Sequence, residues 1–256
     1  ESGLPVLAVD IPSGVNADTG AVMGGALPAV ATVTMQALKA GLLLYPGAKL
    51  CGEIAIADLG IDLTPAEKPF ARLADEALLR RVLPPRKRRS HKGTYGWVIL
   101  LCGSEGMSGA AVLATRGALR SGVGLARVLT PDCNRTVLQT AAPEAIVAAY
   151  TSDQDIKRQT DASAMVAGCG LGTGDTSLRA LRRVLSTRPK AGMIPVVLDA
   201  DGINALSGHI DVLDKRRGRV TILTPHDGEF ARLGGSLSGG RIAAARSFAG
   251  DHGCFL

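Results

Sequence analysis

Short apolar runs recur along the chain, and each ends at a glycine or a polar residue. In the second half, Trp97–Cys102 precedes a loop that contains Gly103, Gly106 and Gly109. A stretch of small residues follows, and a second apolar run covers Leu125–Leu129. This order predicts a strand, a glycine-rich loop, a helix and a second strand, which is the βαβ unit of a parallel sheet.

The same pattern extends to both ends of the chain. Further strands are predicted at Pro5–Val9, Ala31–Met35, Gly52–Ala57, Met165–Ala167, Ile194–Leu198 and Val220–Leu223. Helices are predicted at Leu73–Leu83, at Arg241–Ala249 and after a cap at Asp175 or Thr176. Strands that alternate with helices favour an α/β fold.

Composition narrows the class of protein. The 256 residues can bury a sizeable core, and a charged content of 20% is typical of a globular protein. Aromatic residues make up only 3%, which argues against nucleic-acid modules that stack bases. The net charge of +6 is partly local, because basic residues crowd between positions 80 and 92. That cluster is interpreted as a solvated linker or phosphate-facing edge, with a localisation or polyanion signal as the alternative.

The five cysteines are scattered, without a CxxC pair. This indicates a reducing compartment and no thiolate metal site, and the expected location is the cytoplasm, with mitochondria as the alternative. No apolar run approaches the roughly 18–20 residues that span a bilayer, so no membrane association is expected.

Several polar residues follow predicted strands, where ligands gather in open parallel sheets. Asp10 and Ser13 follow the first strand, Asp199 and Asp201 follow Ile194–Leu198, and His226 follows Val220–Leu223. Each also has a simpler interpretation, because Asp and Ser open turns, Asp caps helices, and a histidine there can be an ordinary surface residue. Gly168, Gly170, Gly172 and Gly174 form a second glycine loop, which by itself is a weak signal.

Longer motifs carry a resemblance to a known family. VDIPSGVNADTG (Val9–Gly20), LKAGLLLYPG and GEIAIADLGI resemble the last part of an NAD(P)H-hydrate epimerase domain. HKGTYGWVILLCGSEGMSGAAVLA, GCGLGTG, VLDADGIN and LTPHDGEFARL resemble a ribokinase-like NAD(P)H-hydrate dehydratase domain. The two domains are fused in this order in bifunctional NAD(P)H-hydrate repair enzymes.

The resemblance implies a fold and a division of the chain. Residues 1–62 would be the C-terminal part of a Rossmann-like epimerase domain, and 63–89 a linker. Residues 90–256 would be the N-terminal part of a ribokinase-like α/β domain. The epimerase half would interconvert the two hydrate epimers. The dehydratase half would use ADP or ATP with Mg²⁺ to restore NADH or NADPH, because phosphorylation turns a poor leaving group, hydroxide, into a phosphate.

Roles carry over residue by residue. Asp10 matches a substrate-contacting aspartate, a plausible acid or base, and Ser13 matches a serine that helps to hold K⁺. Expected substrate contacts in the second domain are Gly109, Ala110, Ala111, Gly170, Asp199, Asp201, Asn204 and His226. Cys169 and Asp227 replace prolines of the family motifs, and the second replacement frees the backbone after His226.

The family pattern also extends beyond both ends of this sequence. An upstream epimerase segment and a downstream glycine loop that bears the catalytic base are expected in the family, and neither matches here. We therefore expect the polypeptide as written to lack dehydratase activity, and the complete protein to be a homo-oligomer. The alternatives are a ribokinase-like small-molecule kinase and a non-catalytic nucleotide-binding remnant.

Overall fold

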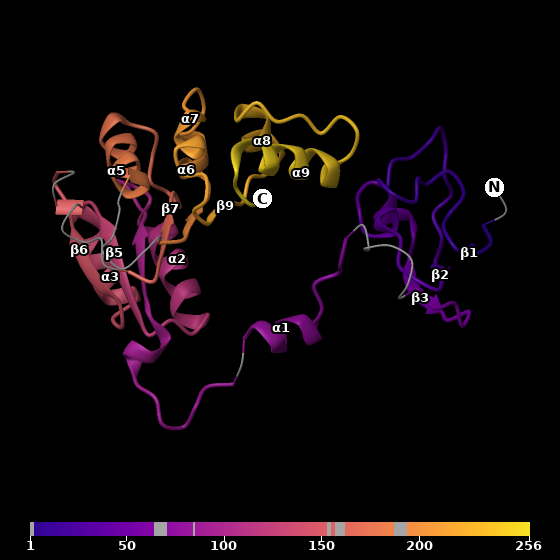
Figure 1. The fold of residues 1–256 in the computed structure, drawn as a ribbon, viewed down its shortest axis with the longest axis horizontal. Helices are drawn as coiled ribbons and strands as arrows, with labels where there is room; N and C mark the ends of the chain where they lie inside the picture. The colour runs from indigo at the N-terminus through magenta and orange to yellow at the C-terminus, as the bar shows by residue number, and fades with distance from the viewer. Residues whose placement is uncertain (1–2, 64–70, 84, 153–154, 157–161, 187–193) are drawn as a thin grey trace. The chain divides into compact units, whose positions relative to one another are not determined.

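A computed structural model describes residues 3–63, 71–83, 85–152, 155–156, 162–186 and 194–256. The chain divides into two compact units (Figure 1). The first contains residues 1–85 with Gly239–Ile242, and the second contains Arg86–Ser238 with Ala243–Leu256. The division lies inside the segment 63–89 that the sequence suggests as a linker, of which prolines 65, 69 and 84 are outside the described residues.

The first unit is built on a three-stranded parallel sheet. The strand order is β1-β2-β3, with bounds β1 Leu7–Val9, β2 Ala31–Met35 and β3 Glu53–Ala57. Two short 3₁₀ helices, Ala40–Leu42 and Gly47–Leu50, precede β3, and α1 spans Glu76–Val82. The helix predicted at Leu73–Leu83 starts later because the Asp75 side chain accepts a hydrogen bond from Leu78 N and caps it.

The second unit contains a six-stranded parallel sheet with the order β6-β5-β4-β7-β8-β9. Its strands are β4 Trp97–Leu101, β5 Leu125–Thr130, β6 Ile146–Ala149, β7 Ala164–Ala167, β8 Val196–Leu198 and β9 Thr221–Leu223. Its α-helices are α2 Ser108–Arg120, α3 Arg135–Ala141, α5 Asp175–Ser186, α6 Asp201–Asn204, α7 Asp211–Asp214, α8 Asp227–Arg232 and α9 Arg241–His252. The 3₁₀ turns Lys92–Tyr95 and Asp132–Asn134 precede β4 and α3.

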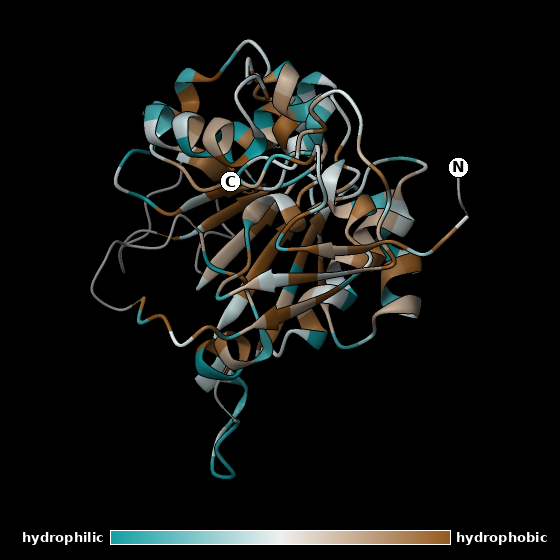
Figure 2. Cartoon of the chain, turned by 90° about the vertical axis from the view of Figure 1, so that its right-hand side faces the viewer, coloured by the Kyte–Doolittle hydropathy of each residue, from teal (hydrophilic) through white to brown (hydrophobic). Residues whose placement is uncertain are grey.

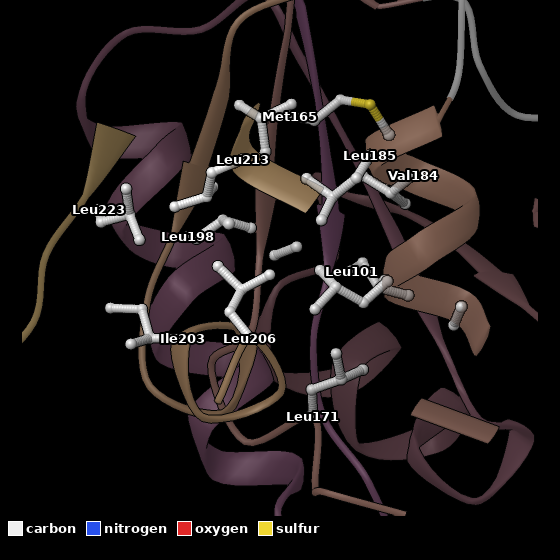
Figure 3. Packing of buried hydrophobic residues seen from close by; sticks show 14 of the residues in the cluster. Leu101, Met165, Leu171, Val184, Leu185, Leu198, Ile203, Leu206, Leu213 and Leu223 are labelled. Atoms are coloured by element: carbon white, nitrogen blue, oxygen red, sulfur yellow. The ribbon is translucent and has the colours of Figure 1, made fainter. Parts of the chain in front are cut away.

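Helices cover both faces of this sheet, as the two-residue alternation along β4 requires. Ile99 and Leu101 point into a cluster with residues of α5 to α9, whereas Val98 and Leu100 pack with α2 and α3. Figure 3 shows the first cluster, and the helices in Figure 2 carry both hydrophobic and hydrophilic residues. The predicted α/β architecture with parallel sheets is confirmed.

No helix among the described residues is both long and apolar enough to cross a membrane.

Candidate functional site

The strand order of the second unit places a topological switch point between β4 and β7, and the region beyond the carboxyl ends of these strands is called the crevice below. From β4 the chain moves outward through β5 and β6, then returns to place β7 on the other side of β4. Accordingly α2, which follows β4, covers one face, and α5, which follows β7, covers the other. Ligands of open α/β sheets bind at such a switch point, beyond the carboxyl ends of the strands. Both glycine loops of the sequence lie there.

The loop after β4 leads into the N-terminus of α2. The cap residue, Met107, offers no side-chain acceptor, and Gly109 has open space where a side chain would be. The first-turn N–H groups of a helix lack partners within the helix and favour anions. Gly109 and Ala110 therefore suit a phosphate contact through the backbone. Ala111 differs, because its side chain is fully buried and packs beneath Gly103.

The loop after β7 touches the first loop directly. Gly170 has a φ of 62°, and a Cβ there would lie 2.7 Å from the Ala110 Cβ. Ser104 Oγ donates to Gly170 O over 2.9 Å, so the two loops are also hydrogen-bonded. Only glycine combines this backbone conformation with so close an approach. The crevice therefore has two walls that are fixed to one another.

Asp201 and Asn204 anchor the second loop from below. Asp201 Oδ2 accepts from Gly172 N over 2.8 Å, and Asp201 Oδ1 accepts from Asn204 Nδ2 over 3.3 Å. Arg232 Nε in turn donates to Asn204 Oδ1 over 2.9 Å. Through these two contacts Asp201 positions the loop. Among the described residues there is also no group of three acidic, histidine or cysteine side chains that could hold a metal ion.

Asp199 lies at the carboxyl end of β8 and contacts both neighbouring segments. Thr224 Oγ1 donates to Asp199 Oδ1 over 2.9 Å, and the Cys169 thiol lies 3.7 Å from Asp199 Oδ2. Burial, followed by the charge of Asp199, raises the pKa of Cys169 to about 11. Cys169, which stands where the family motif has proline, is therefore a neutral thiol donor and not a nucleophile.

The backbone between the two aspartates is strained and closely packed. Ala200 has a φ of 50°, a left-handed conformation that non-glycine residues adopt at a cost. Gly202 packs against β7 so tightly that a Cβ would lie 2.5 Å from Ala167 O. Such strain is retained where the surrounding structure enforces it, often at functional sites. Here it accompanies an arrangement in which Asp199 contacts Cys169 and Thr224 while Asp201 contacts Gly172.

His226 is fixed by the first turn of α8. Its Nδ1 accepts hydrogen bonds from Gly228 N, over 3.0 Å, and Glu229 N, over 3.4 Å. Glu229 completes a capping box, since its Oε2 accepts from His226 N over 2.9 Å. With Nδ1 an acceptor, the imidazole proton must be on Nε2, in a side chain that is 67% exposed. Nε2 lies 3.4 Å from Glu229 Oε1, and because the ring is exposed it is also accessible to a ligand. Asp227, in place of proline, simply opens the helix.

Asp10 is the centre of a polar cluster in the first unit. Lys39 Nζ lies 2.5 Å from Asp10 Oδ1, and the same oxygen accepts from Met35 N at 3.0 Å and Thr34 Oγ1 at 3.3 Å. The hydrogen bond from Lys39, followed by that from Met35, lowers the pKa of Asp10 below its ordinary value of 3.8. Asp10 itself has a φ of 67°, a left-handed backbone conformation like that of Ala200 between Asp199 and Asp201. A half-exposed, ionised carboxylate at the end of β1 suits contact with a substrate.

Ser13 is exposed beside this cluster in sequence and lines an apolar groove with β1. Its hydroxyl is an oxygen ligand of the kind that hard cations such as K⁺ accept. The potassium role stays a prediction.

Comparison with known proteins identifies the family. Residues 98–254 match the family described as NAD(P)H-hydrate dehydratase. The chain belongs to this family. Residues 1–41 match a second family, described as YjeF-related protein N-terminus. The predicted resemblance is confirmed by both matches.

Curated relatives match most of the chain. It is 40% identical to the bifunctional NAD(P)H-hydrate repair enzyme Nnr of Escherichia coli strain K12, over 90% of this chain and 43% of that protein. The corresponding enzyme of Coxiella burnetii is 37% identical over 91% of this chain and 46% of its own length. The chain thus spans less than half the length of these relatives.

Solved structures resemble the chain as well. A hypothetical protein from Streptococcus mutans superposes with a TM-score of 0.61 and 28% identity, over 70% of this chain and 64% of that one. The ADP/ATP-dependent NAD(P)H-hydrate dehydratase of Bacillus subtilis, co-crystallised with ATP and Mg²⁺, has a TM-score of 0.50 and 30% identity, over 70% and 62%. A ribokinase-like protein from Enterococcus faecalis, at 24% identity and a TM-score of 0.58 over 72% and 66%, shows the fold alone.

Some residues of the site escaped the sequence analysis. Lys39 lies in the LKAGLLLYPG motif, in which it was given no role, and Glu229 and Arg232 lie in a helix that the hydrophobic pattern did not show. Asn134, which is 2% exposed, donates to Thr130 Oγ1 and Ser104 O beneath the first glycine loop. A capping-box spacing between His226 and Glu229 is the one signal that could have revealed such a partner.

Proposed function

We propose that the second unit takes part in the nucleotide-dependent dehydration of NAD(P)H hydrate and holds the hydrate at the crevice between β4 and β7. The observation that carries this proposal is the pair of interlocked glycine loops at the switch point, with His226 and Asp199 on the adjacent strand ends. Family membership supports the choice of substrate. ATP or ADP would be the phosphoryl donor, with Mg²⁺ held mainly by its phosphates.

The chemistry assigns separate roles to this chain's residues. Free N–H groups at the start of α2, including those of Gly109 and Ala110, bind phosphate oxygens of the dinucleotide. Gly170 lets its loop pack closely against Ala110, and Asp201 with Asn204 keeps that loop in place. His226 donates from Nε2 to an oxygen of the hydrate. Asp199 accepts from a ligand hydroxyl through the oxygen that faces Cys169.

We propose in addition that Asp10 of the first unit contacts the hydrate during epimerisation, as the YjeF-related match supports. Lys39 keeps Asp10 ionised, so that it accepts a proton or a hydrogen bond. Ser13 would contribute one oxygen to a K⁺ ion. Cytoplasmic location and a homo-oligomeric complete protein remain proposals of the same kind.

Saturation-transfer NMR with NADPH hydrate tests the proposal. Saturating the methyl groups of the chain should attenuate the nicotinamide-ring and ribose signals of the hydrate, and NADP⁺ should show a weaker effect. Adding ATP and Mg²⁺ distinguishes the alternatives. A stable phosphorylated product would indicate a small-molecule kinase. Absence of saturation transfer from the protein to the hydrate would contradict the proposed function.

A further inference from the structure

A pocket lies at the end of the second-unit sheet opposite to the crevice. It has a volume of about 520 Å³ between the last turns of α5 and the segment that includes α7. At its base, Arg216 donates to Ile194 O, just before β8, and to Thr221 Oγ1 at the start of β9. These contacts mark the amino ends of the strands. The candidate site is at their carboxyl ends, so the two are separated by the length of the sheet.

Cations dominate the described lining of this pocket. They are Arg182, His209, Lys215, Arg216 and Arg219. The carboxylate among the described lining residues is Asp211, and Lys215 Nζ lies 2.6 Å from its Oδ2. That pair neutralises itself, which leaves the arginine charges without compensation from the described lining.

Arg216 is unusual because its charge is buried. The residue is 4% exposed, and its guanidinium donates to neutral oxygens: Thr221 Oγ1 at 2.9 Å, Leu185 O at 2.7 Å and Ile194 O at 3.3 Å. The contact with Leu185 O places it at the C-terminus of α5, where the helix dipole favours a cation. This dipole explains why one guanidinium is tolerated there.

The helix dipole does not explain why a second arginine, Arg219, lines the same pocket. Burial, followed by the charge of Arg219, lowers the pKa of Arg216 to about 10. Two guanidinium groups that repel one another across a partly desolvated pocket cost free energy unless an anion lies between them. Arg182, on the exposed side of α5, adds a third guanidinium to the rim.

We propose that this pocket is a second binding site, for a small molecule that carries a pyrophosphate group. Planar guanidinium forks bind phosphate oxygens in pairs, so a multiply charged ligand can engage Arg182 and Arg219. Arg216, whose three nitrogens each donate to a protein oxygen, adds its positive charge from the base of the pocket. A volume of about 520 Å³ exceeds what a single phosphate needs and is in the range of small-molecule sites. The site is distinct from the crevice, so an occupant would not compete with the hydrate.

Calorimetry of the full chain with inorganic pyrophosphate at low ionic strength tests the proposal. We expect saturable binding, and the variant R182A/R219A should bind at least about tenfold more weakly, equivalent to about 1.4 kcal/mol. Both side chains are at the rim, so the buried Arg216 stays intact. The variant R120A removes an exposed arginine from the last turn of α2 and should bind as the unaltered chain does.

Two further measurements test where pyrophosphate binds and which class of anion the pocket prefers. Pyrophosphate affinity should be unchanged in H226N, which alters only the crevice. Sulfate at equal ionic strength should bind at least about tenfold more weakly than pyrophosphate. No binding by the unaltered chain, equal loss in R120A, loss in H226N, or equal affinity for sulfate would each overturn the proposal. Should R182A/R219A not give a native circular-dichroism spectrum, R182A alone replaces it.

Discussion

The carboxylate of Asp10 depends on a neighbour that lies far along the chain. Lys39 is the largest cause of its lowered pKa. We predict that K39A raises the pKa of Asp10 towards 3.8, which a ¹³C NMR titration of the aspartate carboxyls would measure. The exposed K49A is the matched control and should leave that pKa unchanged. An unaltered Asp10 titration in K39A would contradict the assignment.

The same ion pair has a consequence for stability. A carboxyl group whose pKa is lower in the folded state stabilises the fold above its unfolded pKa, and this contribution disappears as the pH falls through the folded value. Urea denaturation should therefore show that K39A loses part of the acid dependence of unfolding below about pH 4. An identical pH dependence in K39A and the unaltered chain would be evidence against this contribution.

His226 owes its orientation to Glu229, a buried carboxylate that closes the capping box. We predict that E229A lowers the free energy of unfolding by about 1–2 kcal/mol, as the loss of a helix cap typically does. The exposed E144A should change it by less than about 0.5 kcal/mol. Equal stability of both variants in urea titrations would show that the box contributes little.

At the scale of elements, the contact between α6 and β7 determines where Asp199 and Asp201 point. We predict that G202A lowers the free energy of unfolding by about 1–3 kcal/mol, because its Cβ would lie 2.5 Å from Ala167 O. Gly174 faces open space, and G174A should be tolerated. A stable G202A with an unchanged spectrum would mean that β7 can shift to accommodate it.

The elements that could be predicted from the sequence are those with a clear apolar period. The strands at Trp97–Leu101 and Ala31–Met35 lie almost where expected, because a short run of strand-forming residues ends at a glycine loop in the first and at polar Gln36 in the second. β6 and α3 were not predicted: Ile146–Ala149 is weakly apolar, and α3 has only Leu138 fully buried. Short elements such as α6 depend on tertiary contacts that no local pattern encodes.

The candidate site was predictable only in part, and for a physical reason. Strand ends mark where Asp10, Asp199 and His226 lie, because parallel strands deliver their following residues to one edge. Which atoms they contact is not a local property. Lys39 reaches Asp10, and Arg232 reaches Asn204, across chain separations that only the fold closes.

At the scale of the whole molecule, the two units differ in how far the side chains of their strands are buried. Leu7 and Val9 of β1 are 60% and 65% exposed, whereas Ile99 and Leu101 of β4 are fully buried. We predict that amides of β4, β5 and β7 exchange with deuterium at least about 100-fold more slowly than those of β1 and β2. Exchange can be measured by mass spectrometry of peptides from each strand. Equal protection factors for the two groups of strands, after correction for intrinsic exchange rates, would contradict this difference in local stability.

We propose above that the crevice between β4 and β7 binds NAD(P)H hydrate with His226 as a donor. Calorimetry of NADPH hydrate with the chain and with H226N tests it most directly. Asparagine can still cap α8 but does not reach as far as the imidazole Nε2. We predict about tenfold weaker binding by H226N, the loss of one hydrogen bond, and unchanged binding by E144A, which alters an exposed residue. No binding by the unaltered chain, or equal affinity of H226N, would contradict the account.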